Sequence, residues 1–103
     1  MNTDLLTWLQ DWYGTHCNGE WEQENGVAIT TVDNPGWWVK IDLRHTPLER
    51  YVREYEFVEN SESDWYAISV EDFLFDAAGD PSKLNFLLQS FRDWAEECAT
   101  KKA

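Results

Sequence analysis

The last part of the chain carries the apolar pattern that most constrains its fold. Between residues 84 and 98, apolar residues recur every three or four positions, at Leu84, Leu87, Leu88, Phe91, Trp94, Ala95 and Cys98. This spacing places them on one face of a helix, and such a face must be buried against another element. Asp80 can cap the helix, and Pro81 suits its first turn. We therefore predict an amphipathic C-terminal helix with Asp80 as its N-cap and Pro81 at its first helical position.

A second helical stripe lies near the N-terminus. Apolar and aromatic residues recur there at the same spacing, at Leu5, Trp8, Leu9, Trp12 and His16. Polar residues occupy the positions between them, as expected for a helix that covers a core with one face. Asn2 or Thr3 could cap this helix, and Gly14 would help to end it.

Between these helices the apolar period changes to two residues, which is the period of a β-strand. Alternating stretches occur at residues 27–32, 37–43, 51–58 and 65–70. Asn34-Pro35-Gly36 separates the first two and fits a type II turn, with a positive φ at Gly36. In the second stretch, alternation places Trp37 on the core side and Trp38 on the opposite side.

The order of these elements predicts one α+β domain over residues 1–103. We expect a four-stranded antiparallel meander, because the connections are short, with the N-terminal and C-terminal helices packed on one face. The tail from about residue 100 is expected to be disordered. A chain of this length forms one core. Two amphipathic helices can cover one face of its sheet but have no obvious means of covering both.

The uncovered face is the candidate binding surface. Alternation in the third stretch places Tyr55 and Phe57 toward the core and acidic residues outward. The predicted partner-binding residues are therefore Trp38, Asp42, Glu54, Glu56 and Trp65. Exposed aromatic anchors among carboxylates are typical of a recognition surface for a basic partner. The alternative is a solvated face on which a cross-strand tryptophan pair shields the backbone.

The charge of the chain is strongly negative. It has 20 acidic and 8 basic residues, for a formal net charge of −12. Such a field repels nucleic acid and anionic membranes and favours cationic partners, although it would also simply keep an aromatic-rich protein soluble. The N-terminal segment resembles neither a signal peptide nor a membrane span, so we expect a cytoplasmic protein with Cys17 and Cys98 as thiols.

The sequence contains no complete catalytic or metal-binding motif. His16 and Cys17 are adjacent, but no third group is identifiable that would orient them as a catalytic pair. The histidines and cysteines lack the short spacings of a zinc site, and no phosphate-binding glycine loop occurs. We therefore predict no enzymatic activity, no metal and no cofactor, and keep a small enzyme using carboxylates or His16-Cys17 as an alternative.

Several short motifs together resemble a known family. The run LTWLQDWYGTHCNGEWEQENGVAITTVDNPGWWVKIDL from Leu6, followed by AGDPSKL and FRDW, is similar to the immunity protein 53 family of bacterial polymorphic toxin systems. The likeness extends from Leu6 to Trp94 and is weakest over residues 44–63. The family's motifs coincide with turn, cap and core positions, so the resemblance assigns no binding residue.

This resemblance implies a cytoplasmic protein that binds a cognate toxin and neutralises it stoichiometrically. Many intracellular toxins act on nucleic acid and present basic clefts, which suits an acidic inhibitor. Two further hypotheses remain open at this point. The chain could be an acidic interaction module that regulates an endogenous protein, and its aromatic face could also pair two copies in a homodimer.

Overall fold

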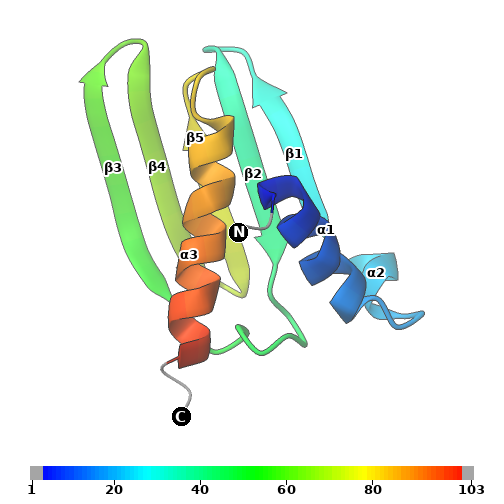
Figure 1. The fold of residues 1–103 in the computed structure, drawn as a ribbon. Helices are drawn as coiled ribbons and strands as arrows, with labels where there is room; N and C mark the ends of the chain where they lie inside the picture. Colours follow the sequence, from blue (N-terminus) through cyan, green and yellow to red (C-terminus); the bar gives the residue numbers. More distant parts are fainter. Residues whose placement is uncertain (1–3, 101–103) are drawn as a thin grey trace.

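The computed structural model describes residues 4–100, which form an α+β fold with one antiparallel sheet (Figure 1). The elements in chain order are α1 (Leu5–His16), α2 (Trp21–Glu24), β1 (Val27–Val32), β2 (Gly36–Asp42), β3 (Arg53–Ser61), β4 (Asp64–Glu71), β5 (Leu74–Gly79) and α3 (Leu84–Thr100). Residues 101–103, in the predicted disordered tail, lie outside the described residues.

The prediction of a four-stranded meander is wrong. The sheet has five strands in the order β1-β2-β5-β4-β3, so the last strand lies in the centre, between β2 and β4. The segment Leu74–Gly79 contains two alanines before Gly-Asp-Pro and was not among the stretches predicted as strands. Hydrogen bonding to a strand on each side outweighs the helix propensity of those alanines.

Both long helices cover the same face of the sheet, as predicted (Figure 1). The sheet buries Val39, Ile41, Leu43, Ile68, Val70, Phe75 and Ala77, and α3 covers them with Leu87, Leu88, Phe91, Trp94, Ala95 and Cys98. Phe91 is fully buried, and its ring meets those of Trp8, Trp12 and Phe75. This aromatic contact joins α1, α3 and the central strand into one core.

The C-terminal helix starts later than predicted. It begins at Leu84, so Asp80 is not its N-cap and Pro81 is not in its first turn. Asp80 instead closes a turn before the helix, where its carboxylate accepts hydrogen bonds from the backbone and hydroxyl of Ser82. The apolar stripe itself is confirmed, because its residues from Leu87 to Cys98 are buried.

The cap of α1 comes from Asp4. Its carboxylate accepts a hydrogen bond from the backbone N–H of Thr7 at 3.2 Å. Asn2 and Thr3, which we predicted as caps, lie outside the described residues. Gly14 does not end the helix, which continues to His16.

Replacing Asp4 by alanine should lower the free energy of unfolding by about 1 kcal/mol, because a helix N-terminus loses its side-chain cap. Thermal unfolding followed by circular dichroism measures the change. Asp11→Ala is the matched control, because Asp11 is exposed on the same helix and its side chain forms no hydrogen bond within residues 4–100. Equal losses in the two variants would contradict the capping role.

The β1–β2 turn also differs from the prediction. The Asn34–Pro35 peptide is cis, and Gly36 does not have a positive φ, so the turn is not of type II. Gly36 instead begins β2, where a Cβ would overlap the carbonyl oxygen of Gly79 and lie 3.3 Å from the Trp65 ring. Glycine is therefore required at this position by close packing.

The two neighbouring tryptophans of β2 point to opposite sides of the sheet, as predicted. Trp37 packs against the core on the helix side, and its indole Nε1 donates a hydrogen bond to the carbonyl oxygen of Pro81 at 3.0 Å. Trp38 lies on the other side and is 36% exposed.

The predicted alternation of β3 is wrong. Phe57 pairs with Ala67 and lies on the side away from the helices, whereas Glu56 pairs with buried Ile68 on the helix side. A register shift between Arg53 and Glu56 changes which residues face the core. Because β3 is an edge strand, Glu56 remains exposed there and binds Arg53 at 3.1 Å.

Candidate partner-binding surface

The side of the sheet away from the helices is not covered by any element within residues 4–100 (Figure 1). Residues directly opposite each other on paired strands share a face, so the register defines this side. We call it the open face, and its strand residues are Ala28, Thr30, Val32, Trp38, Lys40, Asp42, Phe57, Glu59, Trp65, Ala67, Ser69, Glu71, Leu74, Asp76 and Ala78.

On the open face, two aromatic side chains flank a shallow floor that is formed by two alanines. One register row runs across it through Trp38, Ala78, Ala67 and Phe57. The alanines occupy the two strands between the rings, and neighbouring strands lie roughly 4.8 Å apart. A partner side chain could therefore reach the floor between Trp38 and Phe57, which are about 14 Å apart across three strand spacings.

Trp38 is held in a defined orientation. Its indole Nε1 donates a hydrogen bond to Oδ1 of Asp76 at 2.8 Å, and Nζ of Lys40 lies 4.3 Å from the centre of the ring. Both contacts come from open-face side chains, so this ring is fixed before any partner arrives. A fixed aromatic group loses less conformational entropy on binding than a mobile one.

Trp65 lies near the end of the open face. Its backbone N–H donates to Oδ2 of Asp80 at 2.9 Å, and its ring reaches the position that a Cβ of Gly36 would occupy. Trp38 and Trp65 are on β2 and β4, which β5 separates. The alternative interpretation, in which a cross-strand tryptophan pair shields the backbone, needs two tryptophans on neighbouring strands. Trp38 and Trp65 do not form such a pair.

A hollow of 480 Å³ lies between the β1–β2 turn and the β3–β4 turn. We call it the turn-end hollow, and it is lined by Asn34, Pro35, Phe57, Glu59, Glu62, Ser63 and Trp65. Of these residues, only Trp65 was among the binding residues predicted from the sequence. Strand alternation could have identified Glu59 only with the correct register of β3, and nothing in the sequence brings Pro35 beside Phe57.

The predicted acidic residues are dispersed. Asp42 lies on the open face, and its Oδ2 accepts a hydrogen bond from the backbone N–H of Gly26 at 3.2 Å. Glu54 is exposed at the register shift of β3. Glu56 lies on the helix side and also accepts a hydrogen bond from the hydroxyl of Tyr66 at 3.2 Å. Of the five predicted residues, Trp38, Asp42 and Trp65 thus lie on the open face, but the strand register places Asp42 and Trp65 toward opposite ends of it.

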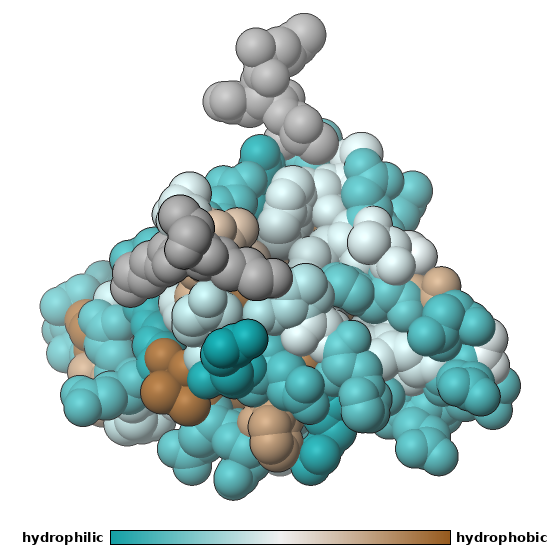
Figure 2. Space-filling model, turned by 90° about the horizontal axis from the view of Figure 1, so that it is seen from below, coloured by the Kyte–Doolittle hydropathy of each residue, from teal (hydrophilic) through white to brown (hydrophobic). Residues whose placement is uncertain are grey.

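The charge of the open face is negative. Among its strand residues, the carboxylates are Asp42, Glu59, Glu71 and Asp76, and the cation is Lys40. Figure 2 views the molecule from the end where α3 finishes, and hydrophilic residues cover most of that surface with hydrophobic ones in separate small patches. A continuous apolar docking patch is not visible from that end.

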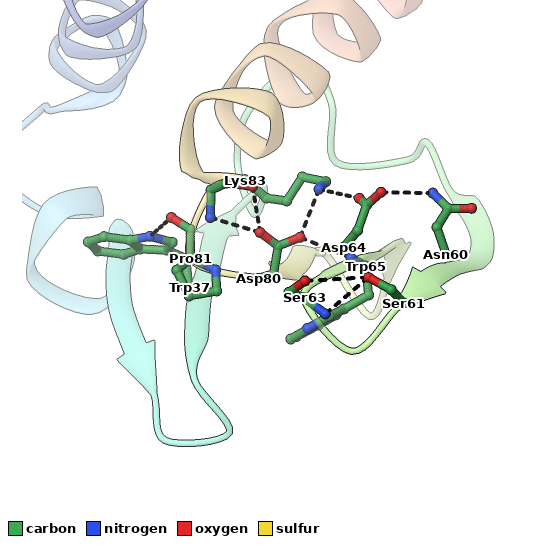
Figure 3. A network of polar contacts seen from close by, with 10 residues as sticks. Trp37, Asn60, Ser61, Ser63, Asp64, Trp65, Asp80, Pro81 and Lys83 are labelled. Atoms are coloured by element: carbon green, nitrogen blue, oxygen red, sulfur yellow. Dashed lines mark hydrogen bonds and ion pairs between the residues drawn. The ribbon is translucent and has the colours of Figure 1, made fainter.

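A charged network fixes the end of the sheet beside Trp65 (Figure 3). Nζ of Lys83 lies 2.7 Å from Oδ2 of Asp80 and 2.7 Å from Oδ1 of Asp64. Burial of Asp80 opposes its ionisation, but hydrogen bonds from Lys83, Ser82 and Trp65 outweigh burial and hold its pKa well below the usual range. This network joins β4, β5 and the approach to α3.

His16 and Cys17 lie at the end of α1 and belong to none of the strands of the open face. The imidazole packs against the rings of Trp12 and Trp21, and burial lowers the pKa of His16. The Cys17 thiol donates to the backbone carbonyl of Tyr13 at 3.3 Å. Within residues 4–100, no group of three or more histidine, cysteine or acidic side chains is arranged to hold a metal ion.

Residues 4–100 thus form a small α+β fold in which no element covers one face of the sheet, and that face carries aromatic and acidic side chains. The chain matches the immunity protein 53 family over residues 6–96, and it belongs to this family. The resemblance seen in the tryptophan-rich helix, the DNPGW turn and the GDP motif is thus confirmed. Searches among curated proteins and among solved structures found no match. None of the helices within residues 4–100 is long and apolar enough to cross a membrane.

Proposed function

We propose that this protein binds a cognate toxin in the cytoplasm and neutralises it stoichiometrically, with the open face as the binding surface. Membership of a family of immunity proteins supports a toxin partner in general. The observation that carries the choice of surface is the uncovered sheet face on which Trp38 and Trp65 lie among carboxylates. No catalytic step is needed for this function.

The partner that fits this surface is basic. A protein with a formal net charge of −12 attracts a cationic partner over long distances and thereby raises the rate of association. Trp38 and Trp65 would supply the apolar anchors, and Asp42 would pair with a lysine or arginine. Glu54 and Glu56 would contribute where the partner reaches around the edge of β3.

Co-expression with each neighbouring open reading frame tests the proposed function. We expect one neighbouring product to inhibit growth alone, to lose its toxicity when this protein is present, and to co-purify with it in a fixed ratio. Salt should weaken the complex, because charge attraction contributes to it. Unrelieved toxicity, or the absence of a co-purifying neighbour, would remove the toxin hypothesis and favour an endogenous partner.

A further inference from the structure

The turn-end hollow combines two kinds of wall. Pro35, Phe57 and Trp65 provide apolar and aromatic surface, and Glu59 and Glu62 provide carboxylates. Its volume of 480 Å³ falls within the range of roughly 300–1,000 Å³ typical of ligand pockets. The hollow therefore has room for a long side chain together with part of the segment that carries it.

The carboxylates of the turn-end hollow have no cationic partner among residues 4–100. Within residues 4–100, neither Glu59 nor Glu62 forms an ion pair. The nearest cation along β3, Arg53, binds Glu56 on the helix side, and Lys83 binds Asp64 and Asp80. The negative charge of the hollow is thus left for an external cation.

The aromatic wall is already in place. The backbone of Trp65 exchanges two hydrogen bonds with Asp80, from its N–H at 2.9 Å and to its carbonyl at 3.1 Å. Its ring extends toward Gly36, where any larger residue would meet it. Phe57 is 52% exposed on the neighbouring edge strand, so its ring remains available for contact.

We propose that the turn-end hollow receives an arginine side chain of the toxin, an inference that rests on the proposed function. A planar guanidinium stacks on aromatic rings and binds carboxylates through paired hydrogen bonds, so it matches both walls at once. A lysine ammonium is a more strongly hydrated point charge and matches the carboxylates alone. A second copy of this acidic chain is disfavoured by charge repulsion.

Glu59→Gln/Glu62→Gln tests the charge of the hollow. Both residues are exposed, so the double variant should fold, which a thermal melt checks. Glu20→Gln/Glu24→Gln is the matched control, because it removes the same two charges from exposed positions at α2. Calorimetric titration with the co-purified toxin should show a Kd about tenfold higher for the hollow variant and little change for the control.

Single substitutions of each toxin arginine by alanine identify the occupant. One of them should weaken binding to the unmodified protein but have little further effect on binding to Glu59→Gln/Glu62→Gln, since the contact is already lost. Equal effects of the hollow and control variants, or additive losses for every arginine, would overturn the inference. In either case tight binding of the unmodified protein would leave the proposed function intact, whereas absence of toxin binding would refute that function itself.

Discussion

Replacing Asp80 by asparagine should lower the free energy of unfolding by about 3 kcal/mol, the lower end of the range for breaking a buried ion pair. Asp80 is 1% exposed, and its two oxygens accept hydrogen bonds from Ser82, Trp65 and Lys83. In asparagine, an amide N–H₂ replaces one carboxylate oxygen, so it would face a hydrogen-bond donor instead of accepting from it, and the negative charge that pairs with Lys83 would be lost. Urea and thermal denaturation should both detect the loss, with a melting temperature lower by more than about 10 °C.

Asp64→Asn is the matched control for this network. Asp64 also binds Lys83 at 2.7 Å, but its side chain is 49% exposed, so water can replace the lost contact. We expect a much smaller loss of stability than for Asp80→Asn. Similar losses in the two variants would show that burial of Asp80 does not govern the stability of this network.

The same network predicts an acid-sensitive fold. The pKa of Asp80 is lower in the folded protein than in the unfolded chain, where an aspartate has a pKa of about 3.9. Its contribution is therefore present above about pH 4 and is lost as the pH falls toward the folded pKa. Melting temperatures at pH 6 and pH 3 should differ less for Asp80→Asn than for the unmodified protein. An equal difference would contradict this source of acid sensitivity.

Replacing Trp38 by alanine should weaken toxin binding by about 2 kcal/mol, or roughly 30-fold in Kd, if this ring is a main anchor of the interface. The ring is fixed by Asp76 and Lys40 and stands beside the alanine floor of the open face. Binding to a purified toxin, measured by calorimetry, gives the change. Trp65→Ala should also weaken binding, through loss of the wall of the turn-end hollow.

Tyr13→Ala provides the control for Trp38→Ala. Tyr13 is 37% exposed, close to the 36% of Trp38, but it lies on α1 and packs against Trp21. We expect its removal to leave toxin affinity nearly unchanged. If Trp38→Ala and Trp65→Ala retain the affinity of the unmodified protein, the open face is not the binding surface.

The elements with strong periodicity could be predicted from the sequence. The apolar stripes of α1 and α3 predicted two helices on one sheet face, and alternation in β2 separated Trp37 from Trp38. Such patterns are local, because each side chain's direction follows from the helix or strand that carries it. Short motifs also predicted the family, and the match over residues 6–96 confirms it.

The position of β5 and the composition of the open face were decided by tertiary structure. Leu74–Gly79 becomes the central strand because β2 and β4 hydrogen-bond to it on both sides, which no local propensity encodes. A register shift moves Glu56 to the helix side and Phe57 to the open face. The sequence alone thus determined the two long helices, the acidic charge and the two outward tryptophans. Long-range strand pairing determined which aromatic and acidic side chains meet in the turn-end hollow.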